Sequence, residues 1–232
     1  MVKRGFVLGA VATAAFSLLL TGVFFNSSAH TPTLEERFAG FGPEAKLSKE
    51  DQTGEYAFDK AHSYIGFRVR HMGLVDVPGS FTDFTGDVVF NADDVKSSTV
   101  EFTAQMKSVD TRVNARDNHL RSKDFFEVDK YPEMTFKSTS VKKKGKQYVL
   151  TGNLTMKGVT KEVTIPFRIY GPMKDERGTV RMGISGATAI NRRDFNVNYG
   201  GNLPDGTPTL SDRVVVEIHA ESVKKKEASA DN

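Results

Sequence analysis

His71 is the side chain in this 232-residue sequence whose position is hardest to explain by packing alone. The stretch HSYIGFRVRHMG, residues 62–73, alternates apolar and polar side chains with the period of a half-buried β-strand. Ile65, Phe67 and Val69 share the apolar face, and His71 follows on that same face. An inward imidazole at a strand end can hydrogen-bond the head group of a ligand. A histidine bonded to a neighbouring protein group is the competing structural explanation.

Three arginines are the other candidates for binding an anionic head group. They lie in residues 111–133, TRVNARDNHLRSKDFFEVDKYPE, a stretch without alternation between two expected strands. The guanidinium groups of Arg112, Arg116 and Arg121 match phosphate oxygens bidentately. A solvated helix face is the alternative for any one of them, and Arg121 could instead pair locally with Asp124.

The usual catalytic and metal-binding patterns are missing from the sequence. It contains no cysteine, which excludes disulfides, thiolate metal sites and a cysteine nucleophile. Ser185 lies in GISG, which lacks the spacing of a nucleophile elbow. His62, His71 and His119 are far apart and show no metal-ligand spacing. We therefore expect no catalytic residue, no metal ion and no cofactor.

The charge balance gives no reason to expect a nucleic acid as partner. The formal net charge is +3, from 32 basic and 29 acidic residues. It falls to +1 without residues 1–29, which carry Lys3 and Arg4 but no acid. Nucleic-acid-binding domains are typically strongly basic on one face.

The N-terminus predicts export. Lys3 and Arg4 precede 21 uncharged residues, from Gly5 to Phe25. This run is long for a signal-peptide core and close to a membrane span, so residues 1–29 are a signal peptide or a signal anchor. Bases ahead of the apolar run place the remainder outside the cytoplasm, in the periplasm or an equivalent compartment. In the anchor case, residues 5–25 tether the chain to the cytoplasmic membrane.

Residues 55–224 predict one antiparallel β domain. Alternating segments recur with short turns and no helix long enough for a parallel crossover, which gives eight or nine strands. We expect an all-β fold, an eight-stranded antiparallel barrel. Residues 30–54 are assigned as a linker, with a capping box at residues 33–36, and residues 225–232 as a disordered tail.

The non-alternating stretch predicts a short helical insertion at one mouth of the barrel. Asn114 can cap the helix, with Asp117 near its positive end. Phe125 and Phe126 follow as an adjacent apolar pair. The insertion is either a lid over a cavity or a plug on a filled core.

The inward positions of neighbouring strands predict an apolar tunnel. Small residues on these positions, such as Gly86, Ala104 and Gly152, either leave volume for a cavity or mark bulges and corners. The residues predicted to line the tunnel are Phe67, Val69, Phe84, Val88, Phe102, Met106, Phe136, Leu154 and Phe167.

Four segments together resemble the YceI-like family of lipocalin-like, polyisoprenoid-binding proteins. They are HSYIGFRVRHMG, HLRSKDFFEVDKYPEMTFKSTSV, GNLTMKGVTKEVTIPFRIYG and INRRDFNVNY, within residues 56–223. The resemblance implies an extended barrel whose cavity holds a lipid with a long apolar tail, either polyisoprenoid or fatty-acid-like. It also implies an exported protein.

The expected function is therefore a lipid carrier or sequestering protein rather than an enzyme. Its partners are an isoprenoid or other long-chain lipid, and the membrane through the N-terminal segment. An enzyme of isoprenoid or lipid metabolism that uses the same cavity is the alternative, and a filled barrel acting as a scaffold is a third hypothesis. The sequence leaves open whether the chain forms a homodimer.

Overall fold

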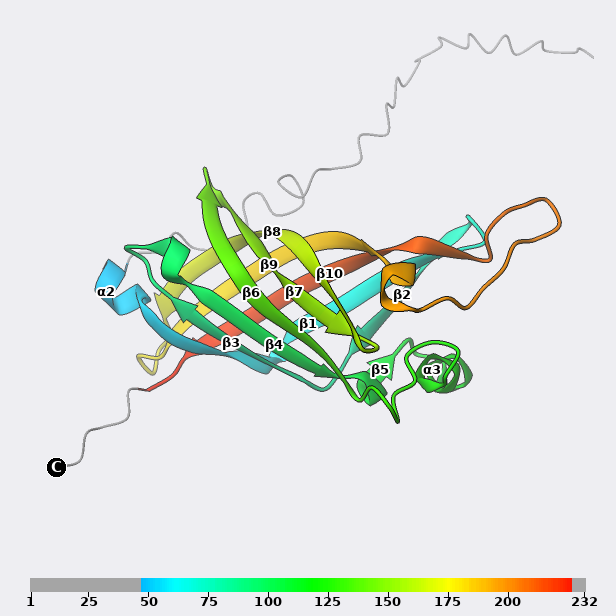
Figure 1. The fold of residues 1–232 in the computed structure, drawn as a ribbon. Helices are drawn as coiled ribbons and strands as arrows, with labels where there is room; N and C mark the ends of the chain where they lie inside the picture. The colour runs from blue at the N-terminus through cyan, green and yellow to red at the C-terminus, as the bar shows by residue number, and fades with distance from the viewer. Residues whose placement is uncertain (1–46, 227–232) are drawn as a thin grey trace, which may run out of the picture.

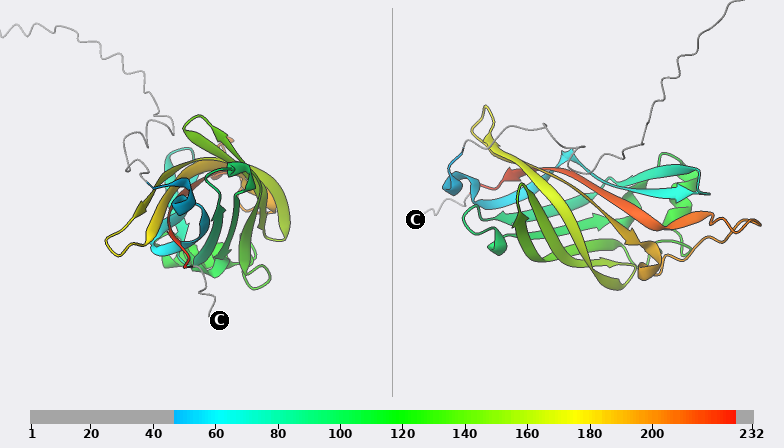
Figure 2. Two further views of the ribbon diagram at one scale, coloured as in Figure 1. Left: turned by 90° about the vertical axis from the view of Figure 1, so that its left-hand side faces the viewer. Right: turned by 90° about the horizontal axis from the view of Figure 1, so that it is seen from above.

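One antiparallel sheet curls round and closes on itself in the computed structural model, which describes residues 47–226 (Figures 1 and 2). The first strand pairs with the last, from Tyr56 opposite Lys224 to His71 opposite Leu210, which closes the barrel. The strands are β1 (Gly54–His71), β2 (Val75–Phe81), β3 (Phe84–Phe90), β4 (Thr99–Gln105), β5 (Val109–Asp110), β6 (Glu133–Lys144), β7 (Gln147–Met156), β8 (Val159–Lys174), β9 (Val180–Asn191) and β10 (Leu210–Lys224).

These ten segments form eight strands of barrel wall, as predicted. β1 pairs with β3 along its first half and with β2 along its second half, so β2 and β3 act as one interrupted strand. β4 and β5 follow them in the same way. β1 is one continuous strand of 18 residues, and its pairing with β10 has a register irregularity between Asp59 and Tyr64.

β2 was not predicted, because its sequence VDVPGSF contains a proline and a glycine that argue against a strand. Pro78 lies opposite Arg68 of β1. On its other side β2 pairs only through Ser80 and Phe81, with β5. The missing N–H of Pro78 therefore costs no hydrogen bond, since that edge has no neighbouring strand at this point.

Within residues 47–226, two α-helices lie at opposite ends of the barrel (Figure 1). α3 (Asn114–Arg121) is the predicted insertion at one mouth, and α2 (Lys49–Gln52) is a single turn at the other end. The described part of the chain also contains the short 3-10 helices η1 (Val95–Ser97), η2 (Met106–Ser108) and η3 (Arg192–Phe195).

The predicted cap of α3 was wrong. Val113 is the N-cap residue, without a side-chain hydrogen bond, and Asn114 is already helical. Asp117 is buried, and its Oδ1 accepts hydrogen bonds from the backbone N–H and the hydroxyl of Thr111, at 2.8 and 2.5 Å. Asp117 thus holds the loop that enters the helix, instead of acting only through the helix dipole.

The end of the barrel near α2 is sealed by a second apolar cluster. It contains Tyr56, Val88, Phe90 and Met182, with Leu47 packed against it. The Tyr56 hydroxyl donates to the carbonyl of Gln52 at 2.5 Å, and burial raises the pKa of this phenol to about 12. Part of the predicted linker, residues 47–52, is therefore docked on the barrel.

Several sequence predictions lie outside the described residues: the leader at 1–29, the capping box at 33–36 and most of the tail. None of the helices within residues 47–226 combines the length and apolar character needed to cross a bilayer.

Aromatic rings cover the small inward residues that the sequence analysis considered as cavity-forming. A Cβ added to Gly86 would lie 2.3 Å from the Phe58 ring, and one added to Gly152 would lie 2.4 Å from the Phe136 ring. Ala104 is fully buried. Their volume is thus filled from neighbouring strands, so these three positions do not create the cavity.

Gly152→Ala is expected to destabilise the protein by about 1–3 kcal/mol, as overpacking of a filled site does. The new Cβ would meet the Lys137 carbonyl oxygen at 2.5 Å in addition to the Phe136 ring. Urea denaturation measures the loss. Gly201→Ala is the matched control, since its added Cβ would meet nothing within 4 Å, and equal losses in both variants would contradict the prediction.

Candidate functional site

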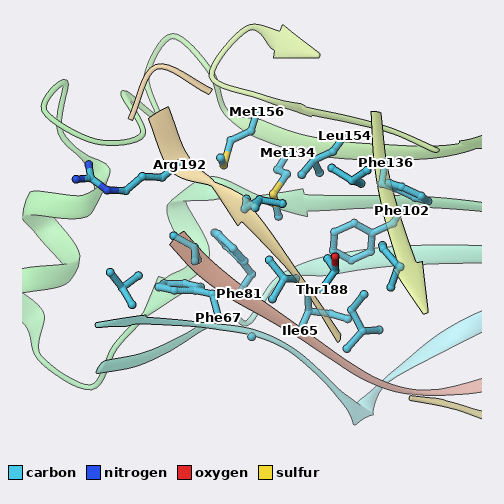
Figure 3. A pocket seen from close by; sticks show the side chains of 18 of the residues that line it. Ile65, Phe67, Phe81, Phe102, Met134, Phe136, Leu154, Met156, Thr188 and Arg192 are labelled. Carbon is cyan, nitrogen blue, oxygen red and sulfur yellow. The ribbon is translucent and has the colours of Figure 1, made fainter. Parts of the chain in front are cut away.

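The inside of the barrel contains an apolar cavity of about 860 Å³ (Figure 3). This is near the upper end of the roughly 300–1,000 Å³ that is usual for small-molecule pockets. Aliphatic, aromatic and methionine side chains from opposite walls line it, among them Ile65, Phe102, Met134 and Leu154. No Asp or Glu within residues 47–226 lines it.

The cavity is closed at the α2 end and open at the α3 end. Phe90 and Met182 line its closed end and are buried in the sealing cluster. At the α3 end, the lining residues Arg116, Tyr199 and Gly201 are exposed to solvent. The site is therefore a blind apolar tube with one mouth, next to the insertion.

Nine of the thirteen residues predicted from the sequence line this cavity. Seven are apolar side chains on inward strand positions, and two are polar groups near the mouth. That they contact a ligand remains a prediction. The nine are Phe67, Val69, His71, Val88, Phe102, Arg116, Phe136, Leu154 and Phe167.

Four predicted residues do not line the cavity: Phe84, Met106, Arg112 and Arg121. Phe84 is buried in the core, where its ring packs against Phe102 at 6.0 Å between centroids. Met106 is buried because strand alternation stops at Gln105 and the chain enters the 3-10 turn η2. Arg112 is exposed and has a positive φ of 65° in the turn before α3.

Arg121 anchors the insertion to the barrel. Its Nε donates to the carbonyl of Lys107 and its Nη2 to the carbonyl of Val109, both at 2.8 Å. The predicted alternative pairing with Asp124 was wrong, because Asp124 accepts from His119 at 3.0 Å instead. Arg121 therefore positions α3 and has no donor role toward the cavity.

Arg121→Ala is expected to lower stability by about 1–3 kcal/mol, because two backbone carbonyls lose charge-assisted donors. This corresponds to roughly 2–12 °C in the melting temperature of a domain of this size. Selectivity between diphosphate and alcohol ligands should not change. Arg112→Ala is the control and should leave the melting temperature nearly unchanged; a specific loss of diphosphate binding in Arg121→Ala would contradict the structural role.

His71 lies at the mouth, at the end of β1, between Val75 of β2 and Leu210 of β10. Its imidazole lines the cavity and is half-buried. Within residues 47–226 the imidazole makes no hydrogen bond to a side chain or backbone group. This weakens the explanation that His71 faces inward in order to bond a neighbouring protein group. The strand therefore turns an imidazole inward where the tube meets solvent.

Arg192 is a cavity-lining residue that the sequence analysis missed. It is 4% exposed, and burial lowers the pKa of its guanidinium. Its Nη1 donates to the carbonyls of Val197 and Tyr199, both at 2.7 Å, and its Nε to that of Ser211 at 3.0 Å. Its Nη2 lies 3.0 Å from an oxygen of Asp212 but is not aligned for a hydrogen bond.

Aromatic rings surround the mouth beside Arg192. The edge of the His119 ring meets Tyr199 and Phe125, at 4.6 and 5.0 Å between centroids, and Phe125 lies 4.8 Å from Tyr199. The sequence predicted aromatic residues in the insertion, but it did not predict that Tyr199 packs there, because Tyr199 lies far along the chain from α3. The mouth thus combines imidazole, guanidinium and aromatic groups above an apolar tube.

The three histidines considered as metal ligands do not meet. His71 and His119 line the mouth, whereas His62 lies in the irregular part of β1 beside Asp59, at 2.9 Å. This pair and Glu221 form the one group within residues 47–226 with ligand atoms close enough for a metal ion. Arg181 already bonds Glu221 at 2.5 Å and lies 3.4 Å from Asp59, so a cation is not required there.

Ser185 and His219 form a hydrogen-bonded pair on the outer face of β9 and β10, 2.7 Å apart. Burial lowers the pKa of the His219 imidazole. Neither residue lines the cavity. The pair therefore cannot act on a ligand held inside the barrel.

The sequence matches the model of the YceI-like domain over residues 56–222, from the first strand of the barrel to the last. A UPF0312 protein of Pectobacterium atrosepticum is 40% identical over 174 residues, which is 74% of this chain and 88% of that protein. Protein YceI of Salmonella arizonae is 41% identical over 145 residues, covering 62% and 76%.

Solved structures show the same fold. BcnA of Burkholderia cenocepacia superposes with a TM-score of 0.63 at 25% identity, over 71% of this chain and 98% of that chain. A YceI protein of Campylobacter jejuni gives 0.58 at 31% identity, over 66% and 88%. A polyisoprenoid-binding domain of Saccharophagus degradans gives 0.57 at 15% identity, over 73% and 98%, which is a likeness of fold alone.

Proposed function

Because the chain belongs to the YceI-like family, whose domain it matches over residues 56–222, we propose that it is an exported protein that holds a long-tailed amphiphile inside its barrel. The ligand is a polyisoprenoid or a fatty-acid-like lipid, held for transport, storage or sequestration. The observation that carries the proposal is the apolar, blind-ended cavity of about 860 Å³. Such a cavity suits a molecule with one long apolar part and one polar end.

The tube orients this ligand. Its tail points toward the sealing cluster near α2, where the walls are apolar. Its head group lies at the mouth beside His71, Arg116 and Arg192. The Nη2 of Arg192 is buried and lies beside Asp212 without an aligned hydrogen bond, so a polar head group could accept a hydrogen bond from it.

Energetics favour a long tail. Each buried methylene contributes about 0.8 kcal/mol. Association costs roughly 4–15 kcal/mol before any net affinity appears. A tail of about ten carbons is therefore marginal unless the head group contributes strongly, and longer tails are favoured.

The enzyme alternative receives little support from the cavity. General acid–base catalysis needs a positioned proton acceptor and donor near the reacting atoms. Histidines and arginines line the mouth, but no carboxylate within residues 47–226 lines the cavity. Acidic residues therefore do not supply the general acid or the general base that an enzyme would need inside the cavity.

Native mass spectrometry of the full-length protein, purified without detergent exchange, tests the binding proposal. We expect a mass increment that corresponds to one copy of a lipid with a long apolar tail. Extraction with organic solvent should remove the increment and release the lipid for identification. A parent protein without bound lipid, which also fails to take up added polyisoprenoid or fatty-acid probes, would refute the carrier function.

Export is a separate part of the proposal and rests on residues 1–29. Cell fractionation should place the barrel outside the cytoplasm. Sequencing of the mature N-terminus separates the two modes of export, because cleavage near Ala29 indicates a signal peptide and an intact Met1 indicates an anchor at residues 5–25. Recovery of the full-length chain in the cytosol would contradict export.

A further inference from the structure

Exposed apolar side chains gather around the mouth of the barrel. Seven large apolar residues in the described chain are exposed. Four of them lie at the mouth end, and we call these four the mouth rim: Leu74 at 78%, Val75 at 56%, Val113 at 46% and Tyr199 at 45%. Single exposed apolar residues are normal on a protein surface, but a cluster marks an interaction site.

The three segments that carry the mouth rim are physically joined. The backbone N–H of Met72, in the turn between β1 and β2, donates to the carbonyl of Thr209 at 3.1 Å. Tyr199, in the segment that leads to Thr209, packs against His119 of α3. Val113 is the N-cap residue of that helix. Figure 1 shows α3 and the β1–β2 turn at the same end of the barrel.

The turn between β1 and β2 has unusual chemistry for an exposed tip. Residues 71–75, HMGLV, contain no charged side chain, and Gly73 is the one residue among them of the types Asn, Asp, Ser, Gly and Pro that tight turns usually carry. Met72 adopts a positive φ of 49°, which non-glycine residues adopt infrequently. Leu74 then projects at 78% exposure. Packing within the described chain does not explain an apolar tip of this kind.

We infer that the mouth rim docks on the surface of a lipid bilayer and inserts its apolar side chains among the head groups. This inference rests on the proposed lipid-binding function. A long tail that left a membrane through water would expose each of its methylenes to solvent, with a cost for every one of them. A mouth seated on the bilayer lets the tail pass directly into the apolar tube. The exposed Arg112, next to Val113, lies where it can pair with a lipid phosphate.

The absence of tryptophan from the chain gives a clean test. Leu74→Trp in the full-length protein introduces a single tryptophan at the mouth rim. With phosphatidylcholine vesicles we expect its emission to shift to the blue, and with vesicles whose acyl chains are brominated we expect most of it to be quenched. Met173→Trp is the control, because Met173 is another exposed apolar residue, at 46% against 78% for Leu74, but lies at the α2 end. Both variants carry the same N-terminal segment, so membrane attachment through that segment alone cannot produce a difference.

Lipid uptake provides a second measurement. Replacing both Leu74 and Val75 with serine should slow the uptake of a fluorescent polyisoprenoid from vesicles by at least roughly tenfold, because burying even one such aliphatic side chain contributes about 1.5–3 kcal/mol. Met173→Ser should have no effect. Lipid already bound should remain in the Leu74→Ser, Val75→Ser protein by native mass spectrometry, since these residues do not line the cavity.

Three outcomes would overturn the inference. One is equal quenching, or no quenching, at positions 74 and 173. Another is unchanged uptake in the double serine variant. The third is a dimer by sedimentation velocity that the double serine variant converts to a monomer, which would make the mouth rim an interface between two copies. Quenching at position 74 in a protein that never binds lipid would instead refute the proposed function and keep the docking surface.

Discussion

Replacing Arg192 with methionine is expected to destabilise the protein by about 3–5 kcal/mol, the usual cost of deleting one partner from a buried charged network. The guanidinium is nearly inaccessible and donates to the carbonyls of Val197, Tyr199 and Ser211. Methionine fills similar volume but offers no donor, so one buried and two partly buried carbonyls lose their partner. The midpoint of urea denaturation measures the loss, since the slope of the transition should not change.

Arg193→Met is the control for this variant. Arg193 is the next residue of the same 3-10 helix, η3, but is exposed, and it pairs with Asp212 at 2.7 Å. Exposed ion pairs contribute about 0–1 kcal/mol, so this variant should stay close to the parent protein. Similar losses in both variants would show that Arg192 does not hold the segment from Val197 to Ser211 together.

The barrel itself could be predicted because alternation is a local signal that the global fold preserves. β3 shows this directly: Phe84, Gly86, Val88 and Phe90 are all buried, while the residues between them are exposed. The same period in most of the other segments, joined by short turns, leaves few architectures apart from an antiparallel barrel or sandwich. The same alternation predicted which apolar side chains face inward and line the cavity wall.

Predictions failed where alternation stops or where a neighbouring side chain intervenes. Met106 continues the apolar parity of β4, but the chain turns into η2 at that residue. Gly152 has inward parity, yet the Phe136 ring occupies the space above it. Whether a glycine opens a cavity depends on the rotamer of a residue on the adjacent strand, which sequence spacing cannot give.

The mouth was the least predictable part of the site. Arg192 and Arg193 are adjacent in INRRDF, and only the 3-10 turn decides which guanidinium is buried. For the insertion, the sequence likewise could not tell which of Arg116 and Arg121 lines the cavity. Arg116 bonds Thr111 and lines the cavity, whereas Arg121 bonds the backbone of η2 and β5. A short irregular segment has no periodicity from which side-chain direction can be inferred.

Val216→Phe is expected to weaken binding of long-tailed lipids by roughly a hundredfold while changing stability little. Val216 lines the cavity on β10, between Phe67 of β1 and Thr188 of β9. It lies about 20 Å along the strand from Leu210 at the mouth, at roughly 3.3 Å per residue. Phenylalanine has four more carbons than valine, and displacing about four buried methylenes costs near 3 kcal/mol of binding.

Tail-length preference distinguishes a blocked tube from a damaged protein. Lipids whose tails end before Val216 should bind the variant as well as the parent, and only longer tails should lose affinity. Val215→Phe is the matched control, because the neighbouring side chain points to the outer face of the same strand and does not line the cavity. If Val216→Phe instead lost about 1–3 kcal/mol of stability, the value for overpacking a solid core, and bound short and long tails equally, the space beside Val216 would not hold the tail.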